Sequence, residues 1–144
     1  MAQFPWSDIY LLGYGPMDDS HREFVDLVDA LLTCSDDDFP ARLEAFARHA
    51  KAHFAEEDEW MERTDFPPRQ CHADEHAAVL NSVNKVMEVV AQGDIAEGRR
   101  LAKALAEWFP GHAAHLDSAL SHWMSKRKFG GKPVVIRRNV VQKS

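Results

Sequence analysis

Hydrophobic residues recur with a helical period along most of the chain. In the stretch MDDSHREFVDLVDALL, apolar side chains stand at positions 24, 25, 27, 28, 31 and 32, which share one face of a helix. Ser20 followed by Glu23 has the pattern of a capping box, in which each side chain binds the other's backbone N–H. We therefore expect a first helix that begins near Asp18 to Ser20 and ends near Cys34.

Proline and glycine mark the limits of three further helices. Pro40 follows the capping residues of SDDDFP and suits a first helical turn, whereas the two prolines of TDFPP stop the same helix. Gly93 and Asp94 close the next helix and cap the one that follows. These signals predict helices over residues 18–34, 40–63, 69–92 and 95–128.

Linkers this short force consecutive helices to run antiparallel, which predicts an all-α, up-down-up-down four-helix bundle. We assign residues 1–128 to this domain, with 1–17 as an N-terminal arm. Residues 129–144 form a short C-terminal extension, and its sequence VVIRRNVV is expected to be an extended piece or a docking segment. At 144 residues the chain is long enough for one domain with a substantial core.

Charge is unevenly distributed. The formal net charge is −6, but residues 126–144 hold seven Lys or Arg and no acid, so the preceding 125 residues carry 23 acids against ten bases. Like-charge repulsion argues against nucleic acid or an anionic membrane as a partner of the acidic body. A partner that docks on the basic tail remains a hypothesis, and oligomeric state is left open.

The cellular compartment is expected to be the cytoplasm. No apolar run approaches the length of a membrane span, and MAQFPWSDIY does not have the form of a signal peptide. Cys34 and Cys71 are too few to form a disulfide framework and suit a reducing compartment.

The chain has eight histidines, and the spacing of several of them indicates a possible metal site. Residues four apart on a helix lie on one face, so His53 with Glu57 and His72 with His76 form two pairs of possible metal ligands, one pair on each of two helices. A single histidine on an apolar face is more often an ordinary core residue than a ligand. Here every predicted helix contributes, and burying so many ionisable groups without a cation would cost several kcal/mol each. The candidate ligands are His21, His53, Glu57, His72, His76, His112 and Asp117.

The last two candidates are five residues apart, which is about 140° around a regular α-helix. Pro110 removes a backbone donor and Gly111 loosens the same turn, so we predict an irregular or π-type turn between Phe109 and Asp117 that brings His112 and Asp117 together.

The other histidines are weaker candidates. His49 stands one turn before His53 and competes with it as a ligand, but His53 is favoured because it pairs with Glu57. His115 and His122 are expected to be exposed or interfacial. Imidazole and carboxylate ligands without a thiolate suit iron, manganese or zinc, and seven ligands are enough for two ions that share the carboxylates.

Taken in order, these motifs resemble those of the hemerythrin family, specifically the single-domain bacterial hemerythrins, over about residues 4–125. The matching stretches are DDSHREF, HFAEEDEWM, PPRQCHADEH and WFPGHAAHLD. The resemblance implies a non-haem di-iron centre that binds O2 reversibly. His72, His76 and His112 would hold one iron, His21 and His53 the iron with an open position, and Glu57 and Asp117 would bridge them. The resemblance further implies a dry O2 pocket, for which the candidates are Phe54, Met61, Trp108 and Phe109.

The expected function is an O2 carrier, store or sensor without catalytic turnover. The alternatives are a di-iron enzyme that acts on peroxide or nitric oxide, and iron storage or detoxification. A small residue, Ala113, follows His112 and would loosen the pocket wall, which favours the enzyme. Against a ferritin-type oxidase, no glutamate is followed three residues later by a histidine.

Overall fold

The secondary structure of residues 2–128, the part of the chain that this computed structural model describes, is entirely helical. Four rods make up the fold, and the last consists of two α-helices joined by a π-helical segment. The elements are the 3-10 turn η1 (Asp8–Tyr10), α1 (Gly15–Thr33), α2 (Phe39–Arg63), α3 (Arg69–Ala91), α4 (Ile95–His112), the π-helical segment η2 (Ala113–Asp117) and α5 (Ser118–Lys128).

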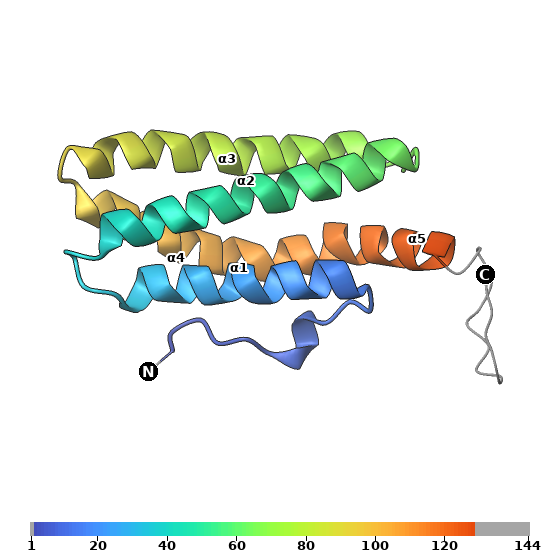
Figure 1. Ribbon diagram of the computed structural model, residues 1–144, viewed down its shortest axis with the longest axis horizontal. Coiled ribbons are helices and arrows are strands. Elements are labelled where there is room, and N and C mark those ends of the chain that lie inside the picture. Colours follow the sequence, from blue (N-terminus) through green and yellow to red (C-terminus); the bar gives the residue numbers. More distant parts are fainter. Residues whose placement is uncertain (1, 129–144) are drawn as a thin grey trace.

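Each rod packs against two others, in the pairs α1 with α2, α2 with α3, α3 with α4 and α4 with α1. Figure 1 shows α2 and α3 as one layer above α1 and α4, with α5 continuing the line of α4. The predicted four-helix bundle is therefore confirmed. The expected docking segment at 134–141 and the basic extension lie outside the described residues.

The predicted start of the first helix is wrong. Helix α1 begins at Gly15, with Pro16 in its first turn, so Ser20 lies inside the helix and forms no capping box. The Asp18 carboxylate instead accepts hydrogen bonds from the backbone N–H groups of Leu12 and Gly13, at 2.8 and 3.0 Å. Proline at a helix start loses no hydrogen bond, because the first N–H groups have no partner inside the helix. Pro16 was thus the stronger signal.

The other boundaries agree with the sequence to within a residue. Gly93 ends α3 with a positive φ of 104°, and the Asp94 side chain accepts a hydrogen bond from the backbone N–H of Glu97 to cap α4. Gly98 allows α4 to approach its neighbours closely, because a Cβ there would stand 2.9 Å from Cγ2 of Val90 and would clash with the Phe39 ring. The cap and this contact fix where α4 enters the bundle.

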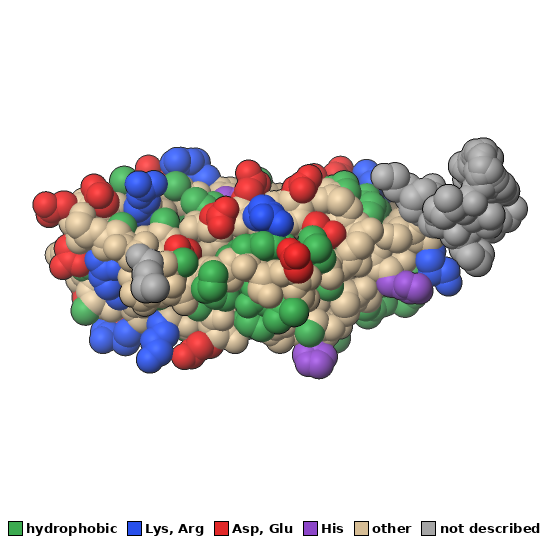
Figure 2. Space-filling view, turned by 90° about the horizontal axis from the view of Figure 1, so that it is seen from below, with side chains coloured by type: hydrophobic (Ala, Val, Ile, Leu, Met, Phe, Trp, Pro, Cys, Tyr) green, Lys and Arg blue, Asp and Glu red, His purple; other side chains and the backbone are tan. Residues whose placement is uncertain are grey.

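The N-terminal arm is held against the bundle. Asp29 on α1 accepts hydrogen bonds from the backbone N–H groups of Gln3 and Phe4, at 2.7 and 2.8 Å. The rings of Phe4 and Tyr10 pack edge-on against Phe109, with centroids 6.1 and 5.4 Å away. Figure 2, which views the molecule from the side of the arm, shows hydrophobic side chains near the middle of this face with charged ones around them. The arm thus covers the outer side of Phe109.

The predicted irregularity in the last rod is confirmed as η2, which begins directly after His112 and ends at Asp117. Pro110 lies inside α4, two residues before its end. The wider π turn returns to the same face after five residues, whereas a regular α-helix would turn Asp117 away. This segment therefore places both His112 and Asp117 in the bundle interior, where both are buried.

Candidate metal centre

All seven side chains expected from the sequence are buried in the middle of the bundle. Their exposed fractions are 5% or less, which is unusual for ionisable groups. They come from all four rods, because His21 is on α1, His53 and Glu57 on α2, His72 and His76 on α3, and the last two flank or end η2. The structure thus brings together His21, His53, Glu57, His72, His76, His112 and Asp117.

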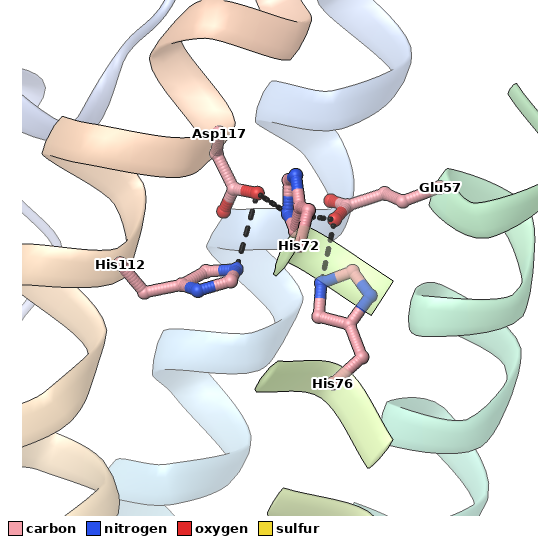
Figure 3. Close-up of side chains that lie close together, drawn as sticks. All are labelled: Glu57, His72, His76, His112 and Asp117. Atoms are coloured by element: carbon pink, nitrogen blue, oxygen red, sulfur yellow. Dashed lines mark ion pairs between the residues drawn. The ribbon is translucent and has the colours of Figure 1, made fainter. Parts of the chain in front are cut away.

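Five of these residues form one group whose ligand atoms all lie within 4.8 Å of one another. Three imidazoles face two carboxylates, as Figure 3 shows, with Nε2 of His72 2.8 Å from Oδ1 of Asp117 and Nε2 of His76 3.2 Å from Oε1 of Glu57. Nε2 of His112 lies 3.2 Å from the same Asp117 oxygen. We call His72, His76 and His112 the three-histidine group.

The second group contains His21 and His53, the two-histidine group, together with Glu57. Nε2 of His53 lies 2.8 Å from Oε2 of Glu57, and Nε2 of His21 lies 2.9 Å from Oδ2 of Asp117. Each carboxylate therefore turns one oxygen to the three-histidine group and its other oxygen to the two-histidine group. Two adjacent cation positions that share both carboxylates are the arrangement this geometry fits.

Several of these buried atoms have no hydrogen-bond partner among the described residues, although nitrogen and oxygen are close. They include Nε2 of His21, His72, His76 and His112, and one oxygen of each carboxylate. An unsatisfied buried polar atom costs about 1–3 kcal/mol, and more if it is charged. In a metal site, the lone pairs of several nitrogen and oxygen atoms point towards a common position and do not form hydrogen bonds with each other. The donor atoms of this cluster are arranged in that way, so they fit bound cations.

The protonation of the metal-free cluster follows from its charges. Burial alone would lower the pKa of His21 and of His72, but the Asp117 and Glu57 carboxylates, whose oxygens lie 2.8–3.6 Å from Nε2 of these rings, raise the pKa of each imidazole to about 9. Burial would raise the pKa of Glu57, yet the four histidines that face this carboxylate hold the pKa well below its usual range. Histidines bind metals in their deprotonated form, so a cation that binds here must displace protons.

Asp117 behaves in the same way. Burial and the charge of Glu57 would raise the pKa of this carboxyl group, but the nearby imidazoles of His112, His21 and His72, with Nε2 2.8–3.2 Å from its oxygens, hold the pKa well below its usual range. Both carboxylates are therefore charged at neutral pH. A pair of buried negative charges of this kind attracts cations to the centre of the bundle.

Outer partners hold three of the histidines in place. Nδ1 of His112 lies 2.7 Å from Oε1 of Glu75, and Nδ1 of His76 lies 2.9 Å from Oδ1 of Asp58. Nδ1 of His53 instead faces another imidazole, that of His49, at 3.3 Å. Such partners fix which ring nitrogen carries the proton and leave Nε2 free to face the centre. His49 is thus placed beside the cluster and not within it.

No motif in the sequence pointed specifically to Glu75 and Asp58 as partners of the ligands. Each stands next to a candidate ligand in the sequence, but acids are frequent in this chain. Glu75 is 37 residues from His112 and Asp58 is 18 residues from His76, so each contact joins two different helices. The signal that could have found Glu75 is its position three residues after His72, on the same helix face. Asp58 stands five residues after His53 and has no such signal. His115 and His122 are both exposed, as expected.

The four aromatic or sulfur side chains expected around an O2 pocket occupy different places. Phe109 packs edge-on against His21 at 5.2 Å, while Phe54 stacks on His76 at 4.1 Å. Trp108 stacks on His112 at 4.3 Å, beside the three-histidine group. Met61 belongs to a separate apolar cluster near α5.

Phe24, which was not expected there from the sequence, faces the two-histidine group. Its ring stacks on Phe109 at 5.1 Å and meets His53 edge-on at 6.0 Å. Its apolar position on the first helix was recognised from the periodicity, but periodicity alone does not distinguish the core from the wall of a pocket.

A buried cluster of histidines and carboxylates, shared among all rods of a four-helix bundle, defines a metal-binding bundle protein with places for two cations. The chain belongs to the hemerythrin family, since residues 12–122 match the family described as Hemerythrin HHE cation binding domain. With this cluster, membership of the family makes the chain a non-haem di-iron protein that binds O2.

Relatives agree with this assignment. The chain is 41% identical over 127 residues to a protein named Bacteriohemerythrin from Ralstonia nicotianae (strain ATCC BAA-1114 / GMI1000), an alignment that covers 88% of this chain and 93% of that protein. Crystal structures of hemerythrin variants, in which one leucine is replaced by alanine or by phenylalanine, superpose with a TM-score of 0.71. They are 19% and 20% identical and cover 84% of this chain and 99% of theirs, which shows that the fold is shared.

Within residues 2–128, every helix is too short or too polar to span a membrane.

Proposed function

We propose that the seven clustered side chains are the ligands of two iron ions and that the protein uses this centre to bind O2 reversibly, as a carrier, store or sensor. The three-histidine group would hold one ion and the two-histidine group the other. Glu57 and Asp117 would bridge the ions. Manganese and zinc suit the same donors, so the choice of iron rests on the family.

The observation that carries this proposal is the division of the carboxylate oxygens. Oε2 of Glu57 faces His53 while its Oε1 faces His76, and Oδ2 of Asp117 faces His21 while its Oδ1 faces His72. A single ion would not use both oxygens of both residues in this alternating manner. Two ions with a shared pair of carboxylates satisfy all of them.

The unequal division of histidines supports O2 binding at one side. Three imidazoles and two bridging carboxylates nearly complete the coordination of one ion, whereas the other receives two imidazoles and the same bridges. When bound, a ferrous pair supplies the electrons that O2 takes up. The protein residues around the two-histidine group determine which molecules reach that position.

Those residues are aromatic. Phe24 and Phe109 stack on each other beside His21 and His53, and the arm residues Phe4 and Tyr10 cover Phe109 from outside. A small uncharged molecule such as O2 can pass between apolar side chains of this kind more easily than water or a hydrated ion can. Exclusion of water and protons favours reversible release over irreversible oxidation. This supports a binding role and not catalytic turnover.

The experiment that tests this proposal is anaerobic reduction of the iron-loaded protein followed by exposure to air. We expect two irons per chain and an absorption band that appears with O2 and disappears when O2 is removed. His115→Ala is the control, because His115 is exposed and should leave both results unchanged. Failure of the band to appear or to reverse would refute reversible binding.

Catalysis is tested separately by steady-state consumption of peroxide or nitric oxide. Many turnovers per site would show that the protein is an enzyme and would refute the carrier function.

We also propose that the protein works in a reducing compartment such as the cytoplasm. Its two free cysteines, of which Cys71 is exposed, support this proposal.

A further inference from the structure

The two histidine groups differ in how their outward nitrogens are held. In the three-histidine group, Nδ1 of His76 and of His112 faces a carboxylate, while Nδ1 of His72 is buried without a hydrogen-bond partner in residues 2–128. In the two-histidine group, Nδ1 of His21 is buried without a hydrogen-bond partner in residues 2–128, and Nδ1 of His53 faces Nε2 of His49. Within residues 2–128, the only hydrogen bond made by an outward Nδ1 of the two-histidine group is therefore the one from His53 to the imidazole of His49, and not to a carboxylate.

This contact favours one arrangement of the protons when a metal is bound. Nε2 of His53 must offer a lone pair to the centre, so the proton of this ring must be on Nδ1. His49 then accepts that N–H at Nε2 and must carry its own proton on Nδ1. Nδ1 of His49 faces α1, where Oε1 of Glu23 lies 3.8 Å away. The surroundings of His49 thus match this arrangement.

Packing holds the two rings in this relation. His49 and His53 are four residues apart on α2, and their rings stand nearly perpendicular, at 84° with centroids 5.3 Å apart. The His49 side chain is 14% exposed, so it lies at the edge of the core. Phe24 contacts both rings, with centroids 6.4 Å from His49 and 6.0 Å from His53.

We propose that His49 is a positioning residue that fixes the protonation and orientation of His53 and thereby determines how strongly the two-histidine group holds its ion. The proposal rests on the proposed function of the cluster. An imidazole acceptor polarises its partner less than a carboxylate does, so the ion of the two-histidine group should be the more weakly bound of the two. His49 itself does not contact the ion.

The test is a titration of the metal-free protein with Co²⁺ in competition with a chelator, followed by visible absorption. The wild-type protein should bind two ions in separate steps. His49→Phe keeps a ring against Phe24 but removes the acceptor, and we expect it to weaken the second step about 10–100-fold while the first step stays unchanged. His49→Gln places an amide oxygen at the same reach and should restore the second step.

A direct measurement comes from the ¹H and ¹⁵N chemical shifts of the His53 Nδ1–H group in the Zn²⁺-loaded protein. This proton should be hydrogen-bonded, and therefore shifted downfield and slow to exchange with solvent, in the wild-type and His49→Gln proteins but not in His49→Phe. A merely structural residue would not produce this difference. His115→Phe is the matched control on an exposed histidine. Far-UV circular dichroism shows whether each variant is folded, and if His49→Phe is not, His49→Leu takes its place.

The outcomes are distinct. An unchanged second step in His49→Phe, equal weakening of both steps, or no restoration by His49→Gln would overturn the role of His49. Binding of fewer than two ions by the wild-type protein would instead refute the di-metal function on which the role depends.

Discussion

Glu75 on α3 lies 2.7 Å from Nδ1 of His112 on α4, so a half-exposed carboxylate holds a buried imidazole across two helices. The same oxygen, Oε1, also accepts a hydrogen bond of 3.0 Å from the indole N–H of Trp108. The Trp108 and His112 rings stack on each other. Glu75 therefore fixes the end of α4 just before the π-helical segment begins.

Glu75→Gln should weaken the first metal-binding step. The amide keeps an acceptor oxygen but loses the negative charge, which reduces the basicity of His112 as a ligand. We expect a loss of about 10–100-fold in affinity for the first ion, measured by chelator competition. Glu107→Gln, on an exposed position of the same α4, is the control and should not change either step. Equal affinities in the Glu75 variant and the wild type would mean that the carboxylate does not tune His112.

Glu57→Ala should lower iron content to one ion per chain or none. The change removes a bridging carboxylate whose oxygens face both histidine groups, and it leaves two cations close together with less negative charge between them. Metal analysis after loading and desalting measures the result. Glu56→Ala removes the preceding, exposed carboxylate and should retain two irons. Two irons per chain in the Glu57 variant would show that the bridge is misassigned.

The helices and the candidate ligands were predictable because both depend on spacing within one helix. Apolar residues three and four apart define a core face, and His53 with Glu57 or His72 with His76 share that face by the same geometry. Pro110 and the five-residue step from His112 to Asp117 together signalled the π turn. Local rules were sufficient for these features.

Features that depend on contacts between helices were not predictable. Asp58 reaches His76 and Glu75 reaches His112 only after α2, α3 and α4 have packed. The start of α1 was misplaced because Ser20 with Glu23 has the form of a capping box, whereas the helix begins at Gly15 with Pro16 in its first turn. In the folded chain Asp18 binds the backbone of the preceding loop, a tertiary demand that the capping pattern does not contain.

Metal-free and metal-loaded protein should respond to pH in opposite directions. In the metal-free protein the pKa of His21 and of His72 is about 9, against an ordinary value of 6.5, so their ion pairs stabilise the fold fully below pH 6.5 and are lost as the pH rises through 9. The lowered pKa of Glu57 and of Asp117 adds stability that is present above their ordinary values, 4.5 and 3.8, and is lost in stronger acid.

The metal-free protein should therefore be most stable between about pH 4.5 and 6.5 and lose a few kcal/mol towards pH 9, since one pKa unit corresponds to about 1.4 kcal/mol. With Zn²⁺ bound, protons compete with the ion for the same nitrogens, so stability should rise over the same interval. Thermal unfolding at pH 6 and pH 9, in a chelator and in excess Zn²⁺, measures both trends. A metal-free protein that becomes more stable towards pH 9 would contradict the assigned ion pairs.

Deletion of Ala114 should leave the metal centre intact. His112 and Asp117 are five residues apart and share a face only because η2 is a π turn. Removing one residue leaves four steps, and four steps on a regular α-helix also return to within about 40° of the starting direction. Ala114 is exposed, so no core contact is lost. The variant should bind two metal ions per chain and should carry a regular α-helix where the wild type has η2.

Deletion of Ala104 is the matched control. Ala104 is also an exposed alanine of the last rod, but it lies in the regular part of α4. Its removal rotates all later residues of the rod by about 100° relative to the buried residues Leu101 and Ala102. Either His112 and Asp117 would then turn away from the metal centre, or Leu101 and Ala102 would turn out of the core. Metal content and thermal unfolding should therefore separate the two deletions sharply. Equal loss of metal in both would mean that the π turn is required for more than the alignment of these two ligands.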